Sequence, residues 1–257
     1  PDRTYQIEIL HDGAYITSEV LPGPGGLPLG ASGRVVGLLS GGFDSPVAAY
    51  RMMKRGCAMT LVHCHAYPFV RPTSIEKVVE LTQHLARHQP GIRLVTVPIS
   101  DAQRQIAVAA EPELRVVLYR RLMLRIASAI AAEEGAGALV TGESLGQVSS
   151  QTLENLRTIE AATSLPVLRP LVGSDKEEII AEAARIGTEP ISRVPDDDCC
   201  TVFVPRHPAT HSTPEQATEA ETHFDVDALV REALAQRTVF TGDPGDWDAL
   251  EAITRGA

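Results

Sequence analysis

Residues 34–46 read Arg34-Val-Val-Gly-Leu-Leu-Ser-Gly-Gly-Phe-Asp-Ser-Pro46, and this stretch decides the fold. Residues 34–39 form a short apolar run of the kind that predicts a buried strand. Pro46 favours the first turn of a helix over 46–55, and Ser45 before it has the side chain of an N-cap. We therefore predict a strand, a tight turn with two glycines and a helix in direct succession.

The same alternation of strand and helix continues along the chain. Apolar runs predict strands over 58–64, 92–97 and 138–141, and a strand or extended turn over 167–171. Helical spacing predicts helices over 74–88, 114–134, 152–161, 175–186 and 224–236. Such alternation is typical of an α/β fold, in which a doubly wound parallel sheet carries helices on both faces.

We predict three parts in the chain. Residues 1–33 comprise a hairpin over 5–18, with its turn at Asp12-Gly13, and a Gly/Pro connector over 21–33. The hairpin is either the remnant of a preceding region or an edge packed on the main domain. Residues 34–204 form that domain. Residues 205–257 form a C-terminal extension, with a loop over 205–222, the helix already named and a weakly ordered end.

Composition narrows the class of protein. Hydrophobic residues are 44% of the chain and charged residues 22%, which is ordinary for a globular protein. No apolar run is long enough to cross a bilayer and no signal peptide is visible, so we expect a cytoplasmic protein without a membrane partner. Four cysteines are too few for a disulfide scaffold. The chain starts at Pro1 instead of Met, and we expect it to be processed or cut from a longer polypeptide.

Charge is unevenly distributed along the chain. The net charge is −10, and residues 196–227 alone hold eight acids and one arginine. A protein that binds nucleic acid unaided usually carries a basic surplus. We therefore expect any RNA docking to depend partly on a separate surface.

The turn Ser40-Gly41-Gly42-Phe43-Asp44-Ser45 has the features of a phosphate-binding loop. Glycines let backbone N–H groups approach a phosphate, two serines add hydroxyl donors, and the next helix directs its positive end to the same point. Asp44 would hold a Mg²⁺ ion that bridges phosphate oxygens, or orient a nucleophile. The alternative is a plain Gly turn capped by serine. The register of strand, loop and helix favours a pyrophosphate-binding loop.

SGGFDS resembles the signature loop of the PP-loop ATP pyrophosphatases, whose fold is that of the adenine nucleotide alpha-hydrolases. Longer strings extend the resemblance: PGGLPLG over 24–30, LVTGESLGQVSSQT over 139–152, LRPLVGSDK over 168–176, and Asp198-Cys199-Cys200. Over residues 15–236 the chain resembles the tRNA 4-thiouridine synthetase family, ThiI. The resemblance implies an enzyme that splits ATP into AMP and pyrophosphate while it adenylates a carbonyl-like oxygen.

The resemblance also assigns residues. It implies that ATP is bound by Leu38, Leu39, Ser40, Gly41, Gly42, Phe43, Asp44, Ser45, His63, Cys64, Arg120, Gly142 and Gln151. Asp44 and Lys176 match the residues expected to be catalytic, and a lysine at a helix start opposes the helix dipole, which itself hints at function. Ordinary explanations stay open: surface charge for Arg120, Arg121 and Arg125, a strand-end position for His63, and a loop acid for Glu143.

The resemblance implies that a cysteine near residue 200 helps release sulfur from a persulfide by forming a disulfide. Cys199 and Cys200 both match. The aspartates before them would raise a thiol pKa, so the sequence does not itself show an activated thiolate. Structural or incidental thiols are the alternative. Cys57 and Cys64 are expected to be packed, and the cysteine spacing does not support an iron–sulfur site.

The implied activity is that of a tRNA uracil 4-sulfurtransferase. ATP and Mg²⁺ serve to adenylate O4 of uridine 8 in tRNA, and sulfur comes from a cysteine desulfurase or other persulfide carrier; the family also supplies sulfur for thiamine thiazole synthesis. The family's upstream THUMP region and downstream rhodanese domain are not seen here, and a homodimer is one option. Two rival hypotheses are a PP-loop ligase that acts on a small molecule and a nucleotide-binding module without activity.

Overall fold

A six-stranded sheet forms the centre of the molecule in the computed structural model, which describes residues 3–196 and 202–241. Its strands are β3 (Arg34–Leu38), β4 (Ala58–His65), β5 (Arg93–Pro98), β6 (Ala138–Val140), β7 (Val167–Leu168) and β8 (Thr238–Phe240). Their order in the sheet is β7-β6-β3-β4-β5-β8. Five strands are parallel, as predicted, whereas β8 pairs antiparallel with β5 and was not predicted.

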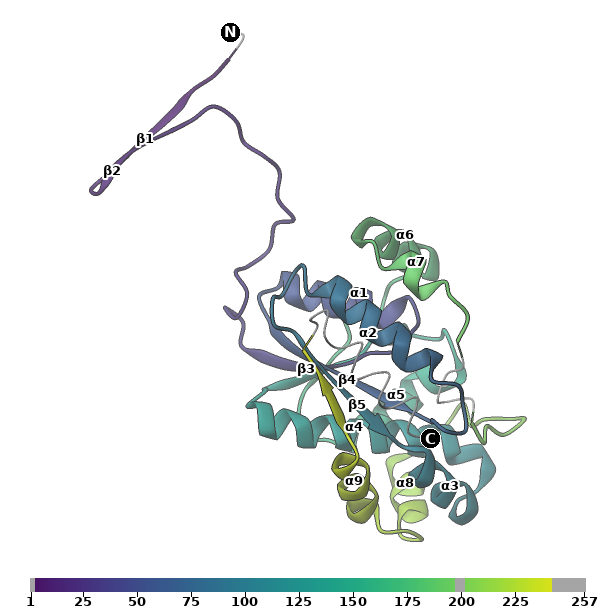
Figure 1. The fold of residues 1–257 in the computed structure, drawn as a ribbon. Coiled ribbons are helices and arrows are strands. Elements are labelled where there is room, and N and C mark those ends of the chain that lie inside the picture. Colours follow the sequence, from purple (N-terminus) through teal and green to yellow (C-terminus); the bar gives the residue numbers. More distant parts are fainter. Residues whose placement is uncertain (1–2, 197–201, 242–257) are drawn as a thin grey trace.

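Helices cover both faces of this sheet, which confirms the doubly wound α/β class (Figure 1). One face carries α1 (Asp44–Lys54), α2 (Thr73–Leu85), α6 (Lys176–Ile186) and the short α7 (Glu189–Ser192). The other carries α3 (Ser100–Ala109), α4 (Arg115–Glu134), α5 (Leu153–Glu160), α8 (Pro214–Glu221) and α9 (Val226–Ala235). Neighbouring strand residues divide between two cores: Val35 packs with the first group and Val36 with the second. Burial on both sides explains the continuous apolar strands.

The order of the strands creates a switch point beside β3. The chain proceeds from β3 through β4 to β5, and then crosses back to place β6 on the other side of β3. The loops that follow β3 and β6 consequently diverge at the carboxyl edge of the sheet. In an open α/β sheet this is where ligands bind.

Two local predictions were wrong. The helix α1 begins at Asp44, two residues earlier than predicted, and its N-cap residue is Phe43 instead of Ser45. Residues 205–222 were predicted to be a loop, but they contain α8. A capping box starts α8, because Thr213 Oγ1 accepts from the Gln216 N–H and Gln216 Oε1 accepts from the Thr213 N–H, at 3.2 and 3.0 Å. That motif is visible in the sequence and could have predicted the helix.

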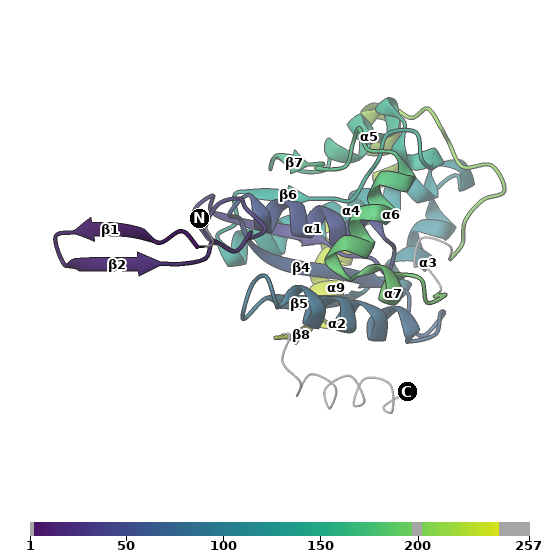
Figure 2. The same ribbon diagram turned by 90° about the horizontal axis from the view of Figure 1, so that it is seen from above.

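The N-terminal hairpin consists of β1 (Gln6–Leu10) and β2 (Gly13–Thr17), whose strands pair from Gln6 with Thr17 to Leu10 with Gly13. Every residue in both strands is exposed. Figures 1 and 2 show the hairpin projecting away from the sheet and its helices. Of the two alternatives for this hairpin, an edge packed on the main domain is therefore not what the structure shows.

The C-terminal segment is packed into the domain as far as residue 241. Phe240 of β8 is fully buried, as are Ala217 of α8 and Leu229 of α9. A domain boundary at residue 204 stays a prediction, but these elements complete one face and one edge of the sheet. Residues 242–257 lie outside the described part of the chain. Within the part described, none of the helices has the length and apolar character needed to cross a membrane.

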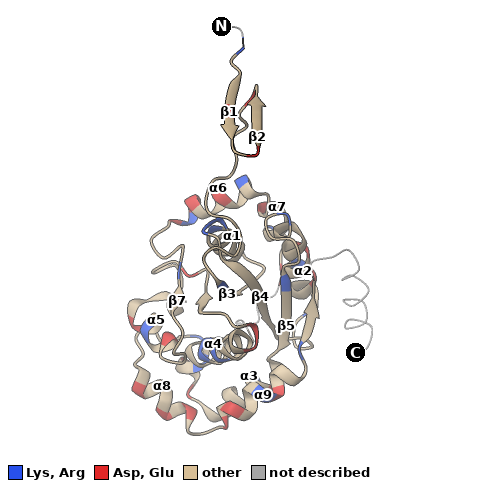
Figure 3. Ribbon diagram, turned by 90° about the vertical axis from the view of Figure 1, so that its left-hand side faces the viewer, with Lys and Arg blue, Asp and Glu red and all other residues tan. Residues whose placement is uncertain are grey.

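Arg121 on α4 contradicts the surface-charge explanation that its helical position favoured. Its side chain is only 2% exposed. It donates two hydrogen bonds of 2.8 Å to Glu221 of α8, which also accepts two from Arg125. Burial opposes ionisation of Glu221, but these arginine hydrogen bonds outweigh that effect and lower its pKa. Carboxylates recur along α8 and α9 (Figure 3), and this one fixes α8 onto α4.

Candidate functional site

A cavity of about 350 Å³ opens at the carboxyl ends of β3, β4 and β6. It contains almost all of the predicted nucleotide-binding residues. Those that line it are Leu38, Leu39, Ser40, Gly41, Gly42, Asp44, Ser45, His63, Cys64, Arg120, Gly142 and Gln151. Phe43 is not among the lining residues. The structure thus brings together segments that are more than 100 residues apart in the sequence, as the switch point requires.

The loop between β3 and α1 is closed by its two serines. Ser45 Oγ accepts from the Ser40 N–H at 2.8 Å and donates to the Ser40 carbonyl at 3.1 Å. Because Ser45 is used in this way, it does not cap the helix, and no side-chain cap hydrogen bond forms at the start of α1. The first N–H groups of this 11-residue helix therefore have no side-chain cap, and Asp44 and Ser45 in its first turn line the cavity. An uncapped helix start at a cavity is an arrangement that can bind an anion.

Close packing around this loop requires Gly142 and leaves little room beside Gly41. A Cβ on Gly142 would lie 2.7 Å from the Ser45 backbone nitrogen and 2.8 Å from the Asp44 carbonyl carbon. A Cβ on Gly41 would lie 2.3 Å from Asp196 Oδ2. Both distances are shorter than real contacts, so the loop after β6 can approach the start of α1 only because Gly142 lacks a side chain.

Asp44 and Lys176, the two residues predicted to be catalytic, are in direct contact. Lys176 Nζ donates to Asp44 Oδ1 at 2.7 Å, although 132 positions separate them, and Gln147 Nε2 donates to Asp44 Oδ2 at 2.9 Å. Lys176 is the first residue of α6, one position after the predicted start at Asp175, which is the N-cap. Its ammonium group also lies 5.5 Å from the centre of the Phe43 ring, a distance at which a cation and an aromatic face attract each other. Phe43 thus supports Lys176 without lining the cavity.

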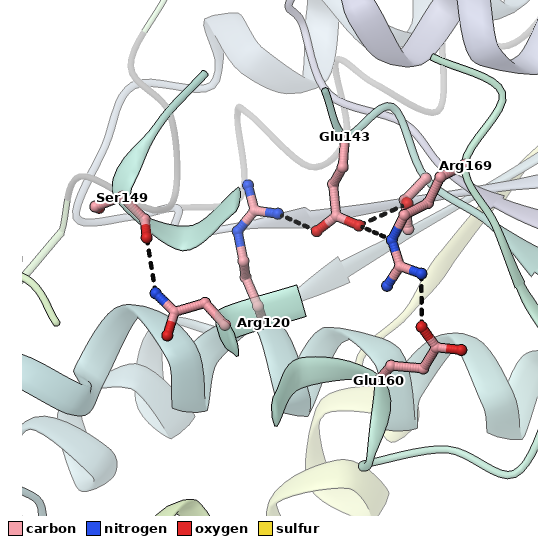
Figure 4. A network of polar contacts seen from close by, with 7 residues as sticks. Arg120, Glu143, Ser149, Glu160 and Arg169 are labelled. Atoms are coloured by element: carbon pink, nitrogen blue, oxygen red, sulfur yellow. Dashed lines mark hydrogen bonds and ion pairs between the residues drawn. The ribbon is translucent and has the colours of Figure 1, made fainter. Parts of the chain in front are cut away.

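Glu143 is the centre of a buried polar network, shown in Figure 4. It is 4% exposed and accepts hydrogen bonds from Arg120 Nη1 at 2.7 Å, Arg169 Nε at 2.8 Å and Thr141 Oγ1 at 2.9 Å. Arg169 Nη1 donates in turn to Glu160 at 2.6 Å. The loop-acid explanation for Glu143 is therefore wrong. An acid directly after a buried strand at the carboxyl edge was the signal in the sequence.

His63 and Cys64 lie near the end of β4 and line the same cavity as this network. His63 Nδ1 donates to the Leu39 carbonyl at 2.9 Å and so joins β4 to the phosphate loop. The next histidine, His65, stacks on His63 with 6.2 Å between the ring centres. Burial, with a smaller contribution from the charge on His63, lowers the pKa of His65 to about 3. Cys57 and Cys64 are both buried, as predicted, and burial raises the pKa of the Cys57 thiol.

Other lining residues were not singled out by the sequence. They include Ser74 in the first turn of α2, Gln147 and Asp196. Gln147 lies inside the string GESLGQVSSQT, whereas Ser74 and Asp196 had no signal of their own. Cys199 and Cys200, the two candidates for a reactive thiol, lie outside the described residues. The described site therefore combines an anion-binding loop, a Lys–Asp pair and an arginine fixed by a buried carboxylate.

Comparison with known proteins agrees with this geometry. Residues 30–226 match the family described as "Thiamine biosynthesis protein (ThiI)". The probable tRNA sulfurtransferase of Thermus thermophilus is 55% identical over 240 residues, which is 93% of this chain and 59% of the relative. That of Moorella thermoacetica is 49% identical over 244 residues, 95% of this chain and 63% of the relative. The chain thus spans about three fifths of the length of these relatives.

Solved structures support the same assignment. A 4-thiouridine synthetase crystallised with RNA and bound ATP is 41% identical, with a TM-score of 0.86 over 93% of this chain and 63% of that one. The NMN synthetase of Francisella tularensis, at 14% identity and a TM-score of 0.50, covers 79% of this chain and 84% of that one, and shows likeness of fold alone. The sequence match, which spans the phosphate loop, the loop after β6 and α6, shows that this chain belongs to the ThiI family.

Proposed function

We propose that this chain carries the ATP-pyrophosphatase part of a tRNA sulfurtransferase that converts a tRNA uridine to 4-thiouridine. The observation that carries the proposal is the uncapped start of α1 behind Ser40–Ser45, at a cavity lined by Arg120 and by Asp44, to which Lys176 donates. The 41%-identical relative with bound ATP and RNA supports both ligands. The family description supports a further role in supplying sulfur for thiamine synthesis.

The triphosphate would bind at the loop over residues 40–45, where backbone N–H groups and the helix dipole favour an anion. Leu38, Leu39, His63 and Cys64 would then contact the nucleoside. Arg120 and Lys176 supply the positive charge, and Gly142 and Gln151 complete the wall. Lys176 would stabilise the charge that develops on the phosphates when the bond between the α- and β-phosphates breaks.

Mg²⁺ fits this site if the nucleotide brings most of its ligands. The described residues contain no group of three or more His, Cys, Asp or Glu side chains placed to hold a metal. Proteins usually bind Mg²⁺ through one or two carboxylates together with substrate phosphates. Asp44, whose two oxygens now accept from Lys176 and Gln147, would hold the ion, which neutralises phosphate charge when it is bound.

The reaction would proceed in two steps. Uridine O4 bonds to the α-phosphorus, the uracil N3 proton is lost, and pyrophosphate leaves. The terminal sulfur of a persulfide, from a cysteine desulfurase or another carrier, then bonds to C4 and AMP leaves. The thiolate of Cys199 or Cys200 then attacks the carrier sulfur of the C4–S–S–carrier bond. The 4-thiolate leaves and takes up a proton to give 4-thiouridine, and the cysteine forms a disulfide with the carrier sulfur that a thiol reductant reopens.

Pyrophosphate release by the complete polypeptide that carries this sequence tests the proposal, with and without unmodified tRNA. We expect release to depend on tRNA, and expect Asp44→Ala or Lys176→Met to lower it by roughly 10²–10³-fold. Cys199→Ser or Cys200→Ser should block 4-thiouridine formation and preserve ATP binding. Release that does not need tRNA would favour a ligase acting on a small molecule. ATP binding without any release would favour an inactive nucleotide-binding module.

A further inference from the structure

A buried lysine lies behind the phosphate loop and has no part in the chemistry just described. Lys77 is on α2, and its side chain is 5% exposed. Its ammonium group donates to the Val194 carbonyl and, at 3.1 Å, to Asp196 Oδ1. A charge is costly to bury unless it is paired and hydrogen-bonded, so these contacts with the segment after α7 account for the burial of Lys77.

This ion pair lies against Gly41 of the loop. A Cβ on Gly41 would be 2.8 Å from Lys77 Cδ and 2.3 Å from Asp196 Oδ2. Ser192 Oγ adds a 3.1 Å hydrogen bond to the Gly42 carbonyl. The segment 192–196 is therefore packed directly on the backbone that would hold the triphosphate, and Asp196 also lines the cavity.

The charges at this point require compensation. Asp196 would place a negatively charged carboxylate beside the bound triphosphate. Because the triphosphate is also negatively charged, the two would repel each other. Lys77 pairs with that carboxylate and is itself not among the residues that line the cavity. Its ammonium group is already shared by two oxygens, so a role in holding Asp196 is favoured over direct contact with phosphate.

We propose that Lys77 and Asp196 are positioning residues that hold the segment 192–196 on the phosphate loop and so couple sulfur transfer to the bound nucleotide. This inference rests on the proposed function, because Cys199 follows Asp196 by only three residues in the sequence. The pair keeps the approach of that segment fixed relative to Gly41 and removes the repulsion between Asp196 and the phosphates. Loss of the Lys77–Asp196 pair should therefore slow sulfur transfer more than pyrophosphate release.

The test measures two rates in the complete polypeptide with unmodified tRNA and a persulfide donor: pyrophosphate release, with its KM for ATP, and 4-thiouridine formation. Lys77→Met leaves a bare carboxylate beside the loop, and we expect it to raise the KM for ATP about tenfold. The ratio of thiolation to pyrophosphate release should fall roughly tenfold or more, because the segment is no longer held in place.

Asp196→Asn separates the two effects. This variant has the same shape without the charge, so it lowers the ratio of thiolation to release without raising the KM. In the double variant Lys77→Met/Asp196→Asn the KM should return toward the wild-type value, while the ratio stays low. Arg193→Met is the matched control, because Arg193 is a 72% exposed cation in the same segment that pairs with Glu189 on α7. It should change neither rate.

The outcomes are distinguishable. Parallel loss of both rates in Lys77→Met, without recovery of the KM in the double variant, would mean that Lys77 acts on the nucleotide itself and would overturn the inference. So would an unchanged ratio in both single variants. A wild-type polypeptide that releases no pyrophosphate and forms no 4-thiouridine would instead contradict the proposed function. Melting temperatures of all variants identify any that fail to fold, and Asp196→Asn, which keeps the size of the side chain, then decides.

Discussion

The buried network around Glu143 makes a quantitative prediction about stability. Glu143→Gln keeps the size of the side chain but replaces its charge with an amide between the two guanidinium groups of Arg120 and Arg169. Removing one partner of a buried ion pair costs about 3–5 kcal/mol. Because the side chains of Arg120 and Arg169 remain 25% and 12% exposed, we expect the lower end of that range.

A loss of about 3 kcal/mol corresponds to a fall in Tm of roughly 6–12 °C, since each kcal/mol shifts a domain of this size by about 2–4 °C. Calorimetry, together with urea unfolding at pH 7, measures both quantities on the chain as it stands. If the slope of the unfolding free energy against urea concentration is unchanged, the substitution has lowered stability and has not changed the compactness of the native or unfolded state.

Glu160→Gln is the matched control for this prediction. Glu160 makes one bond to the same network, to Arg169, and its side chain is 44% exposed. Water screens such a pair, so its loss should cost less than about 1 kcal/mol. If Glu143→Gln unfolds at the same temperature as Glu160→Gln, the buried carboxylate does not hold the two arginines in place, and the proposed fixing of Arg120 is wrong.

Two further predictions concern the cavity walls. Gly142→Ala should lose about 1–3 kcal/mol and weaken ATP binding, because its Cβ would strike the backbone of Asp44 and Ser45; Gly137→Ala, with nothing within 4 Å of the new carbon, should be nearly neutral, and equal melting temperatures for both would contradict this reasoning. His65 has a folded-state pKa of about 3, whereas the ordinary value for histidine is 6.5, so between these values the unfolded state alone takes up its proton. That proton should cost about 1.4 kcal/mol per pH unit down to about pH 3. Between pH 7 and pH 4, the urea concentration at the unfolding midpoint should therefore fall less steeply with decreasing pH in His65→Gln than in the wild type. Equal slopes in the two proteins would contradict a buried neutral imidazole.

Features that depend on local sequence were predictable, and those that depend on long-range pairing were not. The phosphate loop, the parallel strands and the position of Lys176 at a helix start follow from patterns within about fifteen residues. The pairing of Arg121 with Glu221, 100 residues away, leaves no local trace. The same holds for Lys77 and Asp196, which are 119 residues apart.

Short elements were not predicted correctly for a different reason. Three residues of β8 are too few to show a strand pattern, and only pairing with β5 reveals that segment as a strand. Ser45 was assigned to a cap because serine before proline at a helix start usually is one. Its hydroxyl instead closes the loop on Ser40, a competition between two hydrogen bonds that the sequence alone does not decide. The start of α8, by contrast, carries a capping box that is readable in the sequence.

The two outermost strands of the sheet are very short, two residues in β7 and three in β8. An exposed edge strand has unpaired backbone N–H and C=O groups. Another chain can pair with these groups, which leads to aggregation. Here the longer β5 is covered by β8, and β7 offers too little length for a stable ladder. The shortness that hid β8 in the sequence, and that β7 shares, therefore protects the folded sheet from adding further strands at its edges and growing into a fibre.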